Sequence, residues 1–251
     1  MDLNKKVKLG SKTAKNGFRN EEDIIIKFNN WKQHTDAQNW LQIMKYNLDE
    51  IEYVKAIKIK GSYKTDVQVQ ISIKLKESID CKNLSVKLVS NPSGFNQIDK
   101  RWIDKYVELW NIPENIVKLL KLFTGELEPC KKNVRDKRRM FLDEMSDEEQ
   151  NLILSFFREN KILIISDILK GRDKFTADWM LVILKKKINS YEWALKDINT
   201  VMNIYGKDEI KVTNNGSLKI GSITMQRKGG DGGRNSAKML QFKINPCLLF
   251  D

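Results

Sequence analysis

Three segments in the first half of the chain alternate apolar and polar residues, which predicts β-strands. They span residues 54–60, 66–75 and 84–90. A period of two places successive side chains on opposite faces of a sheet. The segment NPSGF at 91–95 contains a proline and a glycine, so the third strand is expected to end in a loop.

Five further segments place apolar residues three and four positions apart, which is typical of amphipathic helices. A capping box beginning at Ser146 supports one of them, and Gly125 suits the end of another. The expected helices span residues 20–32, 98–110, 113–124, 147–159 and 190–205.

The remaining segments are short. Residues 161–165 and 179–184 are interpreted as short strands or buried segments. Residues 209–225 and 238–244 are interpreted as a small antiparallel β meander around glycine-containing turns. Without repeats or low-complexity linkers, the chain is expected to form a single mixed α/β domain over residues 1–251, with added helices.

The net charge of the chain indicates which kind of molecule it binds. The 251 residues carry a formal net charge of +12, and 41% are hydrophobic, enough for a sizeable core. A strong positive field favours a polyanion, with nucleic acid ahead of an anionic membrane. A lysine-rich background, alongside abundant Asn and Ile, is the alternative explanation of the charge.

Several chemistries are disfavoured by residue counts. Three cysteines with no ligand-like spacing indicate a reducing compartment, and a single histidine, His34, makes a Cys/His zinc site improbable. The N-terminus lacks the apolar core of a signal peptide, and no segment approaches a membrane span. A soluble cytoplasmic protein with no membrane partner is therefore expected.

Asp66 and Lys87 fit a pattern found in Mg²⁺-dependent nucleases, a strand-borne acid followed on the next strand by x-x-Lys. Mg²⁺ prefers one or two carboxylates and several waters, so Asp66 can anchor it. The main-chain carbonyl of Val86 can complete the coordination, and Lys87 can hold the attacking water. Ser85 stands where an acid is usual. The alternative interpretation is a turn aspartate and a solvated strand lysine.

Glu21 has two interpretations. It lies with Glu22 in the first turn of the first expected helix, where acids interact favourably with the helix dipole. Alternatively, it faces the metal site as an additional acid.

Two segments carry side chains suited to DNA. Asn and Gln pair with adenine edges, Lys and Arg with guanine edges, and a long side chain can wedge between bases. A surface turn that happens to be basic is the alternative for each segment, and the basic cluster 131–139 is interpreted as generic phosphate contact or solvated surface. The candidates are Asn96, Gln97, Lys100 and Arg101 in residues 91–101, and Gln226, Arg227, Lys228 and Arg234 in residues 226–234.

Ordered blocks of sequence carry a family resemblance from residue 10 to the end. They include GFRNE (17–21), KTD (64–66), VKLVSN (86–91), GFNQIDK (94–100) and QRKGGD (226–231). The chain resembles the HinP-one-I family of type II restriction endonucleases and, more distantly, MspI. The resemblance implies the restriction-endonuclease-like α/β fold, a mixed central sheet flanked by helices, and Mg²⁺-dependent double-strand DNA cleavage, with GCGC the favoured target.

The resemblance also implies roles for individual residues. Asp66 falls on the family's metal-binding Asp, Lys87 on its catalytic Lys, and Glu21 on a helix glutamate. The family's Gln-Val-Lys tripeptide is Ser85-Val86-Lys87 here, and a Ser hydroxyl is shorter and a weaker ligand than a Gln carbonyl. Water fills the gap, or another group such as Gln68, Gln70 or Glu21 assists. The DNA-reading segments fall on the two named above, with Gln97 as the expected wedge.

Competing functions remain open at this point. A catalytically weakened or inactive DNA-binding protein is the main alternative, followed by a sequence-independent nuclease and an RNA-binding protein. A palindromic target implies either a homodimer or sequential nicking by a monomer. A cognate methyltransferase that protects host DNA, without needing to bind this chain, is the expected companion.

Overall fold

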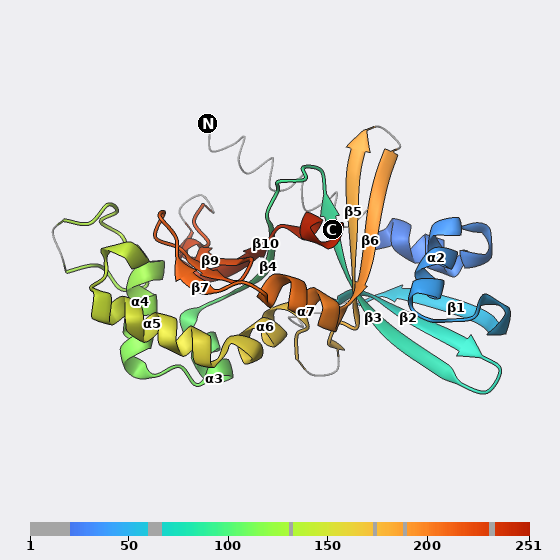
Figure 1. The fold of residues 1–251 in the computed structure, drawn as a ribbon, viewed down its shortest axis with the longest axis horizontal. Coiled ribbons are helices and arrows are strands. Elements are labelled where there is room, and N and C mark those ends of the chain that lie inside the picture. The colour runs from blue at the N-terminus through green and yellow to red at the C-terminus, as the bar shows by residue number, and fades with distance from the viewer. Residues whose placement is uncertain (1–20, 60–66, 131–132, 173–174, 188–189, 231–233) are drawn as a thin grey trace. The chain divides into compact units, whose positions relative to one another are not determined.

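The computed structural model describes residues 21–59, 67–130, 133–172, 175–187, 190–230 and 234–251 (Figure 1). Its internal contacts divide the chain into two compact units. The first unit comprises residues 1–94, 169–202 and 246–251, and the second comprises 95–168 and 203–245. The single domain expected from sequence stays a prediction. In the described part of the chain, no helix has the length and apolar character needed to cross a membrane.

The first unit is built on a mixed five-stranded sheet. The order is β1-β2-β3-β5-β6, and only β3 and β5 run parallel to each other. Helical residues 21–29, the 3-10 helices η1 (Trp31–Gln33), η2 (Leu48–Glu50) and η7 (Pro246–Leu249), and α2 (Thr35–Ile43) complete the unit. The strands are β1 (Ile51–Lys58), β2 (Val67–Leu75), β3 (Ile79–Val89), β5 (Trp179–Lys187) and β6 (Ser190–Asp197).

One face of β3 contributes to the main hydrophobic core of this unit. Leu84 and Val86 pack in a cluster with Phe28 and Trp40 from the N-terminal helical segments. The two aromatic rings lie 5.2 Å apart between centroids. The alternating pattern of the third predicted strand is thus confirmed on its apolar side.

The second unit contains an antiparallel five-stranded sheet and most of the helices. The sheet order is β4-β10-β9-β8-β7. Its strands are β4 (Asn96–Arg101), β7 (Ile210–Val212), β8 (Leu218–Ile220), β9 (Ile223–Arg227) and β10 (Leu240–Ile244). The helical elements are α3 (Ile103–Trp110), α4 (Glu114–Thr124), α5 (Asp147–Glu159), η3 (Leu142–Glu144) and η6 (Asn235–Lys238); α6 (Lys161–Leu169) and α7 (Ile198–Gly206) carry the chain across unit boundaries.

Most predicted elements are confirmed. The helix over 113–124 ends at Gly125 in the left-handed conformation, with φ 80°. Ser146 and Glu149 form the reciprocal capping box at the start of α5. The C-terminal meander is present as β7 to β10, and β4 adds a strand to it.

Three predictions of local structure are wrong. Residues 98–101 pair with β10 rather than beginning a helix, and 190–197 form a strand against β5 rather than the start of a helix. The partner of 98–101 lies far along the chain, whereas β5 directly precedes 190–197, and in both segments strand pairing overrides a local helical pattern. For residues 161–165 only the strand alternative is wrong, since they lie in α6. A short apolar run does not distinguish a strand from a buried helix.

Candidate active site and DNA interface

Ser85 and Lys87 lie side by side on the second face of β3, and both are buried. Their exposed fractions are 0% and 6%. Because β3 has a neighbour on each side and apolar packing on its other face, the strand is enclosed. The interpretation of Lys87 as a solvated strand lysine is therefore wrong. A buried lysine is costly unless a compensating partner is near, so this position is specialised.

The register around Ser85 brings the start of β2 beside it. Val67, the first described residue of β2, is the partner of Ser85 across the two strands. Asp66, the predicted metal ligand, immediately precedes Val67 in sequence and lies outside the described residues. The pairing therefore places the chain neighbour of Asp66 opposite the tripeptide.

A polar clamp fixes where the buried half of β3 begins. The Asn83 amide nitrogen donates to Asp178 at 2.7 Å, and its side chain donates to the Thr176 carbonyl at 3.0 Å. The Asp178 amide in turn donates to the Asn83 carbonyl at 2.9 Å. Because these bonds join β3 to the start of β5, they set the parallel register that carries Ser85 and Lys87.

The residues considered as helpers for Ser85 have separate partners. The side-chain amide of Gln70 donates to the Asn83 side-chain oxygen at 3.0 Å, so Gln70 belongs to the clamp. The Glu21 carboxylate forms an ion pair with Lys58 of β1. The side chain of Gln68 lies outside the described ones. The roles predicted for Glu21 and Ser85 in catalysis stay predictions.

The donor set around β3 fits a hard cation only in part. Among the described residues, no group of three His, Cys, Asp or Glu side chains is placed to hold a metal ion. The buried Ser85 hydroxyl, however, has no hydrogen-bond partner in the described part of the chain. A buried polar oxygen without a partner is expensive, so a water or metal ligated by this oxygen would satisfy it.

In the second unit, one face of the sheet is polar across all five strands. Directly paired residues project from the same face, so the strand register identifies its members. One row crosses the whole sheet and a second crosses three strands. We call this the polar face: Gln97, Lys243, Thr224, Lys219 and Lys211 in the first row, and Lys100, Gln241 and Gln226 in the second.

The polar face unites the two DNA-binding segments predicted from sequence. Lys100 on β4 and Gln226 on β9 both pair with Gln241 of β10. They are therefore two strand spacings apart, roughly 10 Å. A β-bulge at Ile98 leaves both Gln97 and Lys100 exposed, although they are three residues apart.

Other predicted DNA-binding residues lie elsewhere. Asn96 pairs with buried Ile244, which places it on the apolar side of the sheet. The Arg227 side chain is 11% exposed, and its Nε donates to the Ala237 carbonyl at 3.1 Å. Lys228 follows β9, where its amide donates to the Met239 carbonyl at 2.8 Å. Arg234 is exposed at the start of η6.

Charged side chains on the apolar side of β4 form a buried network. Arg101 donates to Asp167 at 2.7 Å and lies 3.5 Å from Asp99, so it is committed to the interior. Tyr106 donates to Asp99 at 2.8 Å, and Trp110 donates to Asp167 at 2.9 Å. The network anchors the strand that displays Gln97 and Lys100.

Burial within the network changes the pKa of Asp99. Burial raises the pKa of Asp99 to about 7, against the hydrogen bond from Tyr106, which lowers it. The neutral acid is therefore favoured in the folded protein at pH values where an exposed aspartate is ionised.

Comparison with known families identifies the class of protein. The family model described as R.HinP1I restriction endonuclease matches residues 44–250. The chain belongs to this family of restriction endonucleases. The resemblance predicted from sequence is thus confirmed, and the enzyme is a site-specific deoxyribonuclease of type II. The match includes the β3 tripeptide and both strands that bear the predicted DNA-binding segments.

Solved structures support the same fold. The restriction endonuclease MspI, in a crystal structure with its cognate DNA, aligns with this endonuclease at a TM-score of 0.61 and 15% sequence identity. The alignment covers 89% of this chain and 87% of MspI. At this identity the likeness shows the fold, so the restriction-endonuclease-like α/β architecture is confirmed. Comparison with curated proteins gave no significant match.

We expect Asp99→Asn to alter how stability depends on pH. Asparagine keeps an oxygen for Tyr106 but cannot ionise. The pKa of Asp99 is near 3.9 in the unfolded chain and about 7 in the folded protein. Its contribution to the stability of the wild type is therefore fully present below pH 4 and is lost as the pH rises to 7. The free energy of unfolding of the wild type should therefore fall relative to Asp99→Asn by roughly 2–4 kcal/mol over this range.

Urea denaturation at several pH values measures this difference. The variant Asp49→Asn, at an exposed position in η2, is the control and should follow the wild type. Parallel profiles for wild type and Asp99→Asn would show that the carboxyl group is not perturbed by burial.

Proposed function

We propose that this endonuclease cuts both strands of double-stranded DNA at GCGC in a Mg²⁺-dependent reaction. The observation that supports the catalytic site is the enclosed pair Ser85 and Lys87 on β3, opposite the first described residue of β2. The family resemblance supports the target sequence, and the polar face supplies side chains that suit base edges.

The metal would be held by the carboxylate of Asp66, the main-chain carbonyl of Val86 and, directly or through water, the Ser85 hydroxyl. When bound, Mg²⁺ neutralises charge on the scissile phosphate and stabilises the leaving oxygen. The Ser85 hydroxyl has no hydrogen-bond partner among the described residues, which supports a role for Ser85 as a metal ligand.

Lys87 is proposed to position the attacking water through its ammonium group. The water oxygen forms a bond to phosphorus as the bond from phosphorus to the 3′ oxygen breaks. The attacking water gives up one proton to solvent, the 3′ oxygen takes up one proton from solvent and leaves as a hydroxyl, and the other fragment keeps a 5′-phosphate. Burial of Lys87 within the sheet restricts its side-chain freedom and favours a fixed position for this group.

Base reading is assigned to side chains of the polar face. Lys100 can donate to the O6 and N7 atoms of guanine, and Gln226 can donate or accept at base edges. Gln97, exposed at the bulge of β4, is the proposed wedge between base pairs. Asn96, Arg227, Lys228 and Arg234 support these groups or contact the backbone.

A catalytically weakened endonuclease is the second candidate, because Ser85 replaces the glutamine that the family resemblance leads us to expect. The oligomeric state on DNA, the protecting methyltransferase and a cytoplasmic location stay predictions.

Digestion of unmethylated plasmid tests the proposed function. With Mg²⁺ we expect discrete fragments whose sequenced ends all lie within GCGC, and none when EDTA is added. Plasmid methylated at GCGC is the matched control and should remain intact. Fragments ending at another fixed sequence would contradict the target, and a smear would contradict sequence specificity.

We expect Ser85→Gln to preserve or raise cleavage, by up to about 10-fold in the single-turnover rate, because an amide carbonyl reaches further than a hydroxyl as a ligand. Ser85→Ala should lower the rate, since no oxygen then remains. Equal cleavage rates for wild type and Ser85→Ala, at equal DNA affinity, would show that Ser85 has no part in catalysis.

A further inference from the structure

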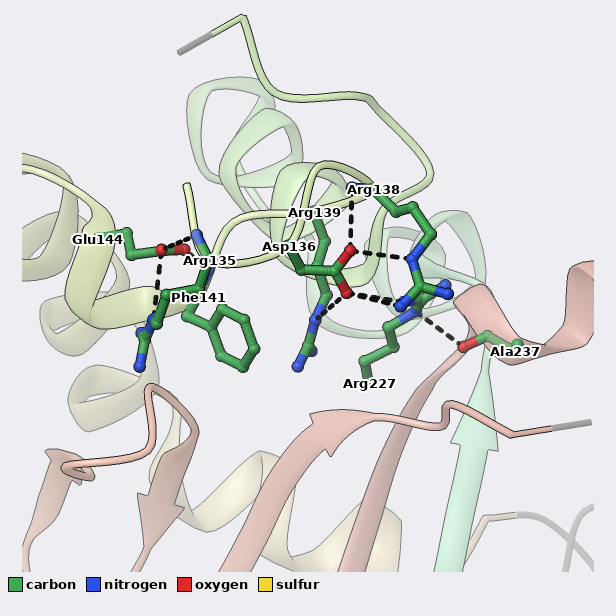
Figure 2. A network of polar contacts seen from close by, with 8 residues as sticks. All are labelled: Arg135, Asp136, Arg138, Arg139, Phe141, Glu144, Arg227 and Ala237. Carbon is green, nitrogen blue, oxygen red and sulfur yellow. Dashed lines mark hydrogen bonds and ion pairs between the residues drawn. The ribbon is translucent and has the colours of Figure 1, made fainter. Parts of the chain in front are cut away.

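An arginine cluster in the second unit lies outside the proposed catalytic site and the polar face, although it includes Arg227. It surrounds the Asp136 carboxylate in the loop before η3 and reaches β9 (Figure 2). We call it the Asp136 cluster: Arg138 and Arg139 from the loop, and Arg227 from β9.

Asp136 is the shared anion of this cluster. Arg138 donates to both of its carboxylate oxygens, from Nε and Nη2, each at 2.9 Å. Arg139 and Arg227 approach the same carboxylate only at ion-pair distances, 3.8 and 3.9 Å. The arginines hold the pKa of Asp136 at about 2, chiefly through the Arg138 hydrogen bonds. Three positive charges therefore share one negative charge.

Arg139 is held in a fixed plane without using its donors. Its guanidinium lies 3.8 Å from the centroid of the Phe141 ring, and Arg135 lies 4.2 Å from the same ring. Figure 2 shows the ring between the two arginines. Arg135 is neutralised by ion pairs with Asp143 and Glu144. Arg139 instead shares the single charge of Asp136 with Arg138 and Arg227.

No side-chain hydrogen bond from Arg139 reaches any described residue, and its Nε is buried without a hydrogen-bond partner there. Its side chain is only 16% exposed. Burial lowers the pKa of Arg139, and the charge of Arg227 lowers it further. A partly desolvated guanidinium with free donors and a cationic neighbour is suited to an additional anion.

We propose that Arg139, beside Arg227, binds a phosphodiester group of the DNA backbone. This inference rests on the proposed action on double-stranded DNA. A phosphate supplies the missing negative charge and two oxygens for the planar donor fork, whereas a neutral base edge would leave the excess charge uncompensated. Asp136 spaces the three arginines before DNA arrives, and stacking on Phe141 orients the fork.

Arg139 is therefore a contact to the DNA backbone that contributes to affinity and not to sequence specificity. Replacing such a residue weakens binding to all sequences alike and lowers the salt dependence of binding by about one phosphate. Replacing a base-reading residue weakens binding to the target selectively. The two roles thus differ in a measurable way.

Fluorescence anisotropy in EDTA, which prevents cleavage, measures binding to duplexes with and without GCGC over a range of NaCl concentrations. For Arg139→Ala we expect about 10-fold weaker binding to both duplexes. The slope of log K against log salt should decrease in magnitude by about 0.9. Lys118→Ala, at an exposed position on α4, removes the same charge and should bind like the wild type.

Arg139→Lys keeps the charge but loses the fork, so it should retain the salt slope and bind both duplexes about threefold more weakly. If thermal melting shows that Arg139→Ala does not fold, the binding of Arg139→Lys alone tests the proposal. Wild-type affinity in both Arg139 variants, or losses confined to the GCGC duplex, would overturn the phosphate assignment while leaving the proposed function intact. Failure of the wild type to bind either duplex would overturn both.

Discussion

The enclosure of β3 is the constraint on which the proposed catalytic site depends. The strand is central in its sheet, with an antiparallel neighbour on one side and a parallel neighbour on the other. Its apolar side chains enter the core, so Ser85 and Lys87 project on a second face that is also buried. An ordinary strand would fill such positions with apolar residues. A serine and a lysine there lower stability unless they are paired, and a role in the chemistry of the site accounts for their presence.

In the second unit, period-two alternation gives the sheet one apolar face and one polar face. Its apolar face buries Asp99, Arg101 and the aromatic residues beneath β4, and its polar face gathers lysines and glutamines from five strands. Separate segments of sequence thereby contribute to one surface. Under the proposed function, catalysis depends on a few enclosed groups of the first unit, while affinity for DNA depends on many groups of the second.

The sequence was informative where local pattern decides structure. The alternation in 84–90, the capping box at Ser146 and the glycine at 125 each act within a few residues, and each is confirmed. Residues 98–101 and 190–197 could not be assigned from local pattern, because their partners β10 and β5 are distant or ambiguous. The alternation of Gln241 and Lys243 with apolar residues was the available signal for the polar face. The clamp between Asn83 and Asp178 has no local signal.

The single-turnover cleavage rate of Lys87→Met tests the central claim most directly. Methionine matches the length of the buried side chain but has no ammonium group, so DNA binding and melting temperature should change little while the rate falls at least about 1,000-fold. Lys82→Met, on the same strand and ion-paired with Asp80, is the control and should cleave normally. A Lys87→Met enzyme that folds, binds DNA and cleaves within a few-fold of the wild type would contradict the proposed site on β3.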